Sequence, residues 1–175
     1  MANTQLLEQY RANRQVTDVK FLKLVRNSFL FNLFLLVKLP MGFIARLKAK
    51  SVTPDACEIS VPYRWINQNP FSSTYFAVLS MAAEMSTGML ALMATQDSKP
   101  SVSMLVTHLE ADFIKKATGI TTFTCTEGKE INAIVEKAIL TGEPQSITTT
   151  SVGTSASGEV EARFKIEWSF RMRKQ

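Results

Sequence analysis

The feature that most constrains the fold is one long apolar run that contains a single charge. Residues 74–94 read TYFAVLSMAAEMSTGMLALMA, and Glu84 is the only charged residue between Arg64 and Asp97. A helix that is apolar all round must be covered on nearly every side, so the run predicts a central helix wrapped by other elements. A buried, unpaired carboxylate costs several kcal/mol, and such groups are usually paired, protonated or used in function. Glu84 is therefore the first candidate for a functional residue.

The rest of the chain supplies the elements that could cover this helix. Alternation of apolar and polar residues predicts strands at 57–63, 102–110, 120–126, 147–152 and 159–170. Pro62 suggests that the first of these strands lies at a sheet edge. Helical spacing predicts a shorter helix over 128–140, ended by Gly142, and Ser72 and Ser73 are candidate caps for the long helix. This order predicts an α+β fold, with a sheet wrapped around the long helix.

The first 50 residues differ in composition from the remainder, and we expect two parts: a helical extension over 1–50 and a main domain over 51–175. The extension carries nine Lys and Arg residues against Glu8 and Asp18, a net charge of +7, and its helical pattern breaks near Pro40. One interpretation is a packed helical extension with a solvated basic face. The other is peripheral contact of residues 20–47 with an anionic membrane surface or a phosphorylated ligand. The basic residues are not interleaved with stacking aromatics, so we expect no nucleic-acid binding.

Other classes of function have little support in the sequence. Cys57 and Cys125 fall in predicted strands, no CxxC pair occurs, and His108 is the only histidine, so we expect neither a metal site nor a cofactor. The two thiols are expected to be buried and free, and His108 to be structural. No signal-peptide pattern opens the chain, which favours a cytoplasmic location. The small residues and the central acid of 74–94 favour a soluble core helix over a membrane span.

Small or weakly polar residues share the helix face of Glu84: Ala77, Ser80, Met81, Thr87, Gly88 and Ala91. Such a stripe allows close approach to the helix backbone. It is consistent with a packed interface in which Glu84 is hydrogen-bonded to a neighbour, and equally with a ligand chain lying against the helix.

The sequence around this stripe resembles the hotdog-fold acyl-CoA thioesterase superfamily. In one branch, a loop Asn precedes the acid of the central helix by fifteen residues, as Asn69 precedes Glu84 here. The segments DFIKKATG at 112–119 and EGK at 127–129 are also similar to family motifs. The resemblance covers residues 51–171, and residues 1–50 look like the extension of a functionally uncharacterised branch. Where the family has His-Gly-Gly, this chain has Tyr-Phe-Ala at 75–77.

The resemblance implies hydrolysis of an acyl thioester, with Glu84 as general base or nucleophile and Asn69 orienting the water or the carboxylate. The backbone N–H groups of Phe76 and Ala77 would stabilise the oxyanion. Basic side chains would contact the phosphates of coenzyme A, although each could equally be a solvated surface charge: Lys115, Lys116, Lys129 and Arg64. The family also implies a homodimer or a dimer of dimers, with a site shared between subunits. The alternative is a hotdog protein that binds a fatty-acyl or other lipid chain without cleaving it, which the altered 75–77 segment favours.

Overall fold

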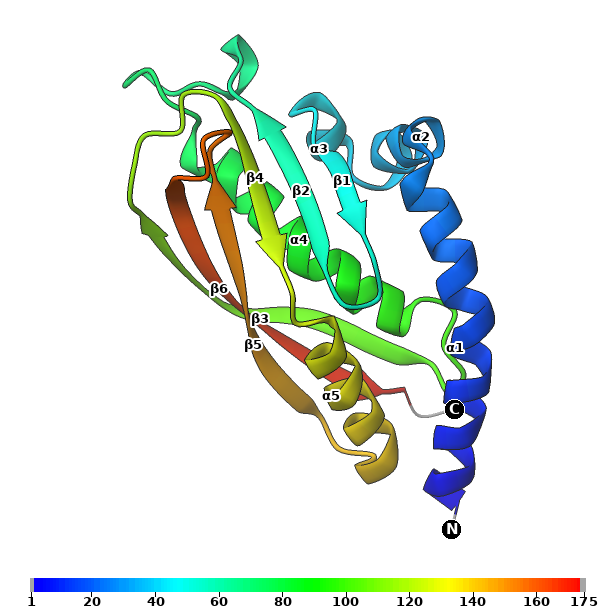
Figure 1. Cartoon of the computed structure of the whole chain (residues 1–175). Helices are drawn as coiled ribbons and strands as arrows, with labels where there is room; N and C mark the ends of the chain where they lie inside the picture. The colour runs from blue at the N-terminus through cyan, green and yellow to red at the C-terminus, as the bar shows by residue number, and fades with distance from the viewer. Residues whose placement is uncertain (1, 174–175) are drawn as a thin grey trace.

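The structure, a computed structural model, describes residues 2–173 and consists of one six-stranded sheet with helices packed against it (Figure 1). The elements in chain order are α1 (Ala2–Arg26), α2 (Ser28–Lys38), α3 (Pro40–Ile44), β1 (Lys48–Val52), β2 (Cys57–Pro62), the 3₁₀ turn η1 (Trp65–Asn67), α4 (Phe76–Thr95), β3 (Val102–Phe113), β4 (Ile120–Cys125), α5 (Gly128–Thr141), β5 (Gln145–Thr154) and β6 (Val160–Met172).

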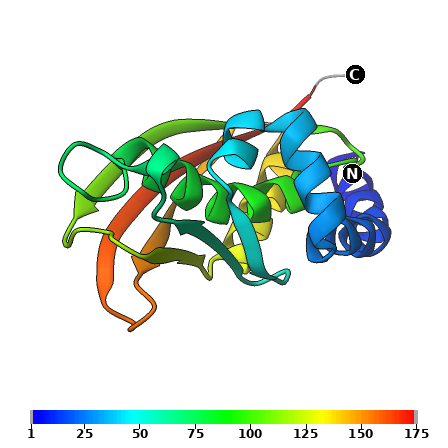
Figure 2. The same cartoon turned by 90° about the horizontal axis from the view of Figure 1, so that it is seen from above.

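The sheet is antiparallel throughout, in the order β1-β2-β4-β5-β6-β3. Figure 2 shows strands on either side of α4, so the sheet curves around this helix. Apolar residues of β6 face the core, among them Phe164, Ile166, Trp168 and Phe170. Their alternation with charged residues is the predicted pattern, except that Glu161 is also buried and accepts a hydrogen bond from Thr121. The predicted α+β hotdog arrangement is confirmed.

The central helix α4 occupies the predicted position and is buried over most of its surface. Within the described residues it is the one helix long and apolar enough to cross a membrane, and its place inside the sheet accounts for that composition. The prediction that Ser72 or Ser73 caps it is wrong. Tyr75 is the N-cap residue and forms no side-chain cap bond, while Ser73 bonds to Asn69 instead.

The N-terminal segment is helical as expected, but it ends in a strand that the sequence patterns did not reveal. β1 pairs with β2, so the predicted boundary at residue 50 falls inside β1, and β2 is an interior strand rather than an edge. Pro62 is tolerated because it lies at the end of β2, beyond the pairing with β1. α1 docks through Tyr10, whose buried hydroxyl donates to the carbonyl of Ala94 at 2.9 Å.

The sheet edge formed by β3 is long and lacks a neighbour within the described chain. A register shift between Val106 and His108 disturbs its alternation, so that His108 lies exposed beside Glu110. Leu105 and Leu109 are also exposed on this strand. An edge of this kind is available for pairing with another chain.

Candidate functional site

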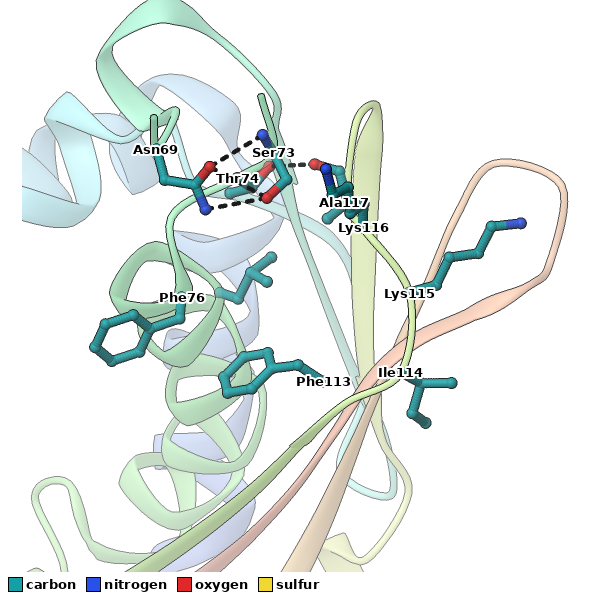
Figure 3. Close-up of a pocket in the computed structure, with 10 residues that line it drawn as sticks. Asn69, Ser73, Thr74, Phe76, Phe113, Ile114, Lys115, Lys116 and Ala117 are labelled. Carbon is teal, nitrogen blue, oxygen red and sulfur yellow. Dashed lines mark hydrogen bonds between the residues drawn. The ribbon is translucent and has the colours of Figure 1, made fainter. Parts of the chain in front are cut away.

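The segment between η1 and α4 forms one wall of a cavity at the N-terminal end of α4. Asn67 anchors it: its buried side-chain amide donates to the carbonyls of Ala45 and Pro62, both at 2.9 Å. Thr74 closes the other end, because its N–H and its hydroxyl both donate to the carbonyl of Ala117. These bonds join the loop to α3, β2 and the segment after β3, which fixes the approach to α4. Figure 3 shows Thr74 beside Ala117.

The cavity has a volume of about 320 Å³ and combines an aromatic side with a polar side. Phe76 and Phe113 form the aromatic side, with ring centroids 6.2 Å apart in an edge-to-face arrangement. Figure 3 shows the two rings next to one another below Asn69 and Ser73. An apolar chain with a polar end group would find matching surfaces here.

Asn69 lines this cavity, but its side chain is engaged in the loop. Its Oδ1 accepts hydrogen bonds from the N–H groups of Phe71 and Ser73, at 3.0 and 3.2 Å, and its Nδ2 donates to the hydroxyl of Ser73 at 3.0 Å. An amide bonded in this way shapes the loop and has one N–H left to offer. Its predicted role in orienting a water or carboxylate stays a prediction.

The two N–H groups predicted for the oxyanion are available. Phe76 and Ala77 are the first two residues of α4, and the first N–H groups of a helix have no intrahelical acceptor. Since Tyr75 forms no side-chain cap, neither N–H donates to any acceptor within residues 2–173. These donors lie at the positive end of the helix dipole, which suits an oxygen that gains negative charge.

Glu84 lies two turns further along α4, on the helix face that is least covered. Ala77, Ser80 and Met81 are partly exposed on this face, whereas most of the helix is buried. Within the described chain the Glu84 carboxylate has neither a hydrogen-bond donor nor an ion-pair partner, so the packed-interface interpretation with a bonded Glu84 is not observed. Burial raises the pKa of this carboxyl above its ordinary value.

The carboxylate is directed toward the C-terminal part of α4. A Cβ atom built on Gly88 would lie 2.9 Å from Oε1 of Glu84 and 3.2 Å from Cζ2 of Trp168. Trp168 is held in place because its indole N–H donates to the hydroxyl of Thr87 at 3.0 Å. The absence of a side chain at position 88 therefore leaves the space that the Glu84 carboxylate occupies beside the indole ring.

The acid and the free N–H groups do not meet in one chain. Ala77 and Glu84 are seven residues apart, which is about 10 Å along the helix axis. The carboxylate also extends toward Gly88, away from Ala77. A reacting carbonyl must lie about 3 Å from both the attacking atom and the oxyanion donors. One copy of this chain thus holds the Glu84 carboxylate and the free N–H groups in different places.

The four basic residues predicted to contact phosphate lie in three separate regions of the structure. Lys115 and Lys116 line the cavity, but Lys115 points toward the β5–β6 hairpin and pairs with Glu159 at 2.7 Å (Figure 3). Lys116 donates to the backbone carbonyl of Phe71. Lys129 lies near Asp55 at the opposite end of β2 and β4, so the structure does not bring it to the cavity.

Arg64 is also separate from the cavity. It lines a second hollow, together with Arg46, Trp65, Ile66 and Ile44. Arg64 therefore belongs to the surface formed by α3 and η1.

Several residues at the site were not found from the sequence. Phe113 lies in the family-like segment 112–119, and β3 extends three residues beyond the predicted strand 102–110 to include it. Trp168 falls within the predicted strand 159–170, but its contact with Gly88 and Thr87 joins segments about 80 residues apart, and no local sequence pattern indicates such a contact.

The two cysteines behave as expected. Cys57 and Cys125 are buried, free and directly opposite one another in β2 and β4. Burial raises the pKa of both thiols, that of Cys125 to about 12, so neither is a reactive thiolate near neutral pH. Within residues 2–173 no cluster of His, Cys, Asp and Glu is placed to hold a metal ion.

Comparison with solved structures shows the fold clearly. A protein of unknown function from Pseudomonas aeruginosa, described as a probable thioesterase, superposes with a TM-score of 0.71 at 20% identity, covering 82% of this chain and 95% of that one. A protein of unknown function from Chlorobaculum tepidum TLS gives 0.68 at 16% identity, covering 81% and 92%. A thioesterase from Haemophilus influenzae gives 0.59 at 11% identity, covering 82% and 91%. At these identities the likeness shows the hotdog fold.

Comparison with known sequences identifies a family but no curated relative. No curated protein sequence matches this chain. One family model, Domain of unknown function (DUF4442), matches residues 28–170. The match begins at α2, inside the predicted 1–50 extension, so α2 and α3 are part of the family domain and α1 lies outside it. The chain belongs to the DUF4442 family and has the hotdog fold of the thioesterase superfamily.

Proposed function

We propose that the protein hydrolyses an acyl thioester, with Glu84 as general base or nucleophile. The observation that carries the proposal is the state of Glu84: a half-buried carboxylate, without a partner in the described chain, on the least covered face of the central helix. A raised pKa makes the ionised carboxylate a stronger base. The free N–H groups of Phe76 and Ala77 supply the donors that an oxyanion requires.

The site is completed by a second copy of the chain. The acid and the oxyanion donors are about 10 Å apart along one helix, so a productive site takes Glu84 from one copy and the α4 N-terminus from the other. The free edge of β3, with Leu105 and Leu109 exposed, is suited to pairing with its own counterpart. Pairing there would bring two copies of α4 to a common interface.

The cavity suggests how the rest of a thioester would be held. Lys116 is bonded only to a backbone carbonyl, so a phosphate can compete for its ammonium group. The ion pair of Lys115 with Glu159 is solvent-exposed and therefore contributes little. Phe76 and Phe113 offer an apolar surface next to these charges, which fits an acyl or pantetheine chain joined to a phosphorylated carrier such as coenzyme A.

The second candidate function is binding of a fatty-acyl or other lipid chain without cleavage. Two observations favour it: the Phe76 side chain occupies the position where the family has glycine, and the Asn69 amide is used within its own loop. Both would slow a reaction that needs close approach of a carbonyl to the helix start.

Release of free thiol from short, medium and long acyl-CoA esters tests the proposal. Wild type should turn over at least one ester, and Glu84→Gln should lower kcat by at least about a hundredfold, because the amide keeps the size but not the charge. Asn69→Ala is expected to raise KM more than it lowers kcat, since it loosens the loop. Equal rates for wild type and Glu84→Gln would refute the catalytic role. No turnover, with a lipid found in the purified protein by mass spectrometry, would support the binding function.

Mixed copies test the shared site. Phe76→Pro removes one oxyanion N–H at a helix position that accepts proline, and Phe76→Ala is the matched control that keeps the N–H. Phe76→Pro and Glu84→Gln should each be inactive alone. After mixing and subunit exchange, half of the dimers contain both variants, and one of their two sites is intact. Activity should then recover to about a quarter of wild type. No recovery after confirmed exchange would place both groups in one chain and contradict the shared site.

A further inference from the structure

The second helix leaves most of its apolar surface uncovered. α2 is apolar over most of its surface, a composition typical of a buried helix, yet the α2 residues that pack into the core are Phe31, Phe34 and Leu35. The apolar side chains exposed on α2, on α3 and between them are Phe29, Leu30, Leu33, Leu36, Val37, Leu39, Met41, Phe43 and Ile44. A soluble monomer rarely exposes so many adjacent apolar residues, and such a surface marks an interaction site.

The surface continues from α3 onto η1. Ile44 shares a hollow with Trp65 and Ile66, and the Trp65 side chain is 83% exposed. Figure 1 shows α2 and α3 at the upper end of the molecule, with α5 well below them. We call the exposed apolar residues of 29–44 together with Trp65 and Ile66 the α2–η1 surface.

Basic residues border the α2–η1 surface, and acidic residues are missing from it. Between Asp18 and Asp55 the chain has no Asp or Glu at all, while it has seven Lys and Arg residues. Arg26 is used in hydrogen bonds to the carbonyl of Val52. The other exposed members are Lys20, Lys23, Lys38, Arg46, Lys48 and Lys50, and Arg64 lies beside Arg46. Within residues 2–173 none of these seven side chains takes part in an ion pair. Arg46 and Arg64 line the hollow of Ile44 and Trp65, and Lys48 and Lys50 line a hollow with Phe31 of α2. We call the seven residues the basic ring, and their positive charge is uncompensated.

We propose that the α2–η1 surface docks the protein on a lipid bilayer that contains anionic lipids. The charge identifies the occupant: apolar side chains enter the acyl boundary while the basic ring meets negative headgroups. A second copy of the chain is a poorer fit, because a symmetric contact would place one basic ring against the other. α2 has 11 residues and is about 16 Å long, half the thickness of the hydrocarbon layer, so it lies in the interface and does not span it.

Docking on the bilayer does not depend on thioester hydrolysis. The proposal is the same if the protein binds a lipid chain without cleaving it. Docking places η1 at the bilayer surface, and the loop that follows η1 lines the cavity with Asn69. A substrate or ligand with a long acyl chain partitions into membranes, so the docked protein would have its cavity close to the bilayer that contains this ligand.

Flotation of the full-length protein with vesicles tests the proposal. One set consists of phosphatidylcholine alone, and the other contains phosphatidylglycerol as about a third of the lipid. Wild type should float with the anionic vesicles, and its bound fraction should fall as salt is raised. Leu36→Glu should lower the partition coefficient at least about tenfold, because it removes an apolar contact and adds a negative charge. Leu140→Glu on α5 is the matched control, since Leu36 and Leu140 are 50% and 46% exposed, and it should have no effect.

The basic ring is tested in the same way. Lys38→Ala should lower the partition coefficient about fivefold, and Lys137→Ala on α5 should leave it unchanged. Trp65 gives an independent signal: the chain has two tryptophans and Trp168 is buried, so anionic vesicles should shift the emission of Trp65 to the blue. The shift should be absent in Trp65→Phe.

Three results would overturn the proposal. The first is absence of binding to anionic vesicles. The second is equal loss of binding in Leu36→Glu and Leu140→Glu. The third is a lower molecular mass of Leu36→Glu than of wild type in lipid-free solution, measured by light scattering, which would show that the surface joins copies of the chain. Failure of thioester hydrolysis changes none of these readings.

Discussion

The substitution Gly88→Ala tests whether the position of the Glu84 carboxylate matters. The added Cβ would lie 2.9 Å from Oε1 of Glu84, and ordinary contact begins near 3.4 Å. The difference, 0.5 Å, is the least that the carboxylate must move. The indole of Trp168, 3.2 Å from the same Cβ, is less able to yield, because its N–H is bonded to Thr87. The flexible carboxylate is therefore the group that shifts.

The expected effects on stability and on activity differ in size. Replacing a helical glycine by alanine gains about 1 kcal/mol in helix propensity. Crowding of Trp168 costs about 1–3 kcal/mol, so the net loss in the free energy of unfolding is about 0–2 kcal/mol. Displacement of a reacting group by 1 Å can cost about a hundredfold in rate. For half that displacement we expect kcat to fall about tenfold, with KM little changed.

The assay is thiol release from the best acyl-CoA ester, beside urea unfolding of the same preparations. The double variant Glu84→Gln/Gly88→Ala completes a cycle. If Gly88→Ala acts through the carboxylate, it should lower the residual activity of Glu84→Gln no further. Gly119→Ala is the control, because a Cβ at position 119 would meet nothing within 4 Å.

A kcat of Gly88→Ala within twofold of wild type would refute the reasoning, because the carboxylate would then be displaced without consequence. Equal losses in the wild-type and Glu84→Gln backgrounds would also refute it, since the effect would then arise from Trp168 or from the fold.

Three further predictions concern stability and are measured by urea unfolding. Burial raises the pKa of Glu84, so the folded state holds this proton more tightly than the unfolded chain, and stability is lost as the pH rises from the unfolded to the folded pKa. Glu84→Gln should therefore stabilise the protein at about pH 8 and not at about pH 3.5; a gain of equal size at both would contradict the assignment. Tyr10→Phe leaves the buried carbonyl of Ala94 without its hydrogen-bond donor and should lower the free energy of unfolding by about 1–3 kcal/mol. An unchanged urea midpoint would show that α1 is not docked through this hydroxyl. Gly153→Ala places a Cβ 2.5 Å from the buried ring of Phe123 and should cost about 1–3 kcal/mol or more, against no effect if the ring can move aside.

Elements whose evidence is local were predicted well. α5 ends as predicted at Gly142, which adopts a positive φ of 74° and donates its N–H to the carbonyl of Ala138. β6 also follows its alternation. β1 was missed because its sequence, KAKSV, has little apolar alternation and is a strand only through its pairing with β2. The cap of α4 was assigned wrongly because Ser73 is drawn into the bonds of Asn69, a competition that composition does not reveal.

The structure brings some of the candidate site residues together and separates others, and their roles stay predictions. One cavity is lined by Asn69, Phe76 and Lys116. They meet because the loop before α4 is hydrogen-bonded, through Thr74 and Ala117, to the segment between β3 and β4. Lys129 lies at the opposite end of β2 and β4, and Arg64 lines a different hollow. Both positions depend on how the strands pair and how the loops pack, which the local sequence does not indicate.

The sequence alone determined that a single acid lies on a helix that must be buried, because an apolar run of this length has no other stable environment in water. It also determined the basic, acid-free stretch between Asp18 and Asp55. Only the tertiary structure decided the direction of the Glu84 carboxylate, which lies beside Gly88 and the indole of Trp168 and away from the helix start. That direction depends on packing between segments far apart in the chain, and it keeps the carboxylate away from the free N–H groups of Phe76 and Ala77.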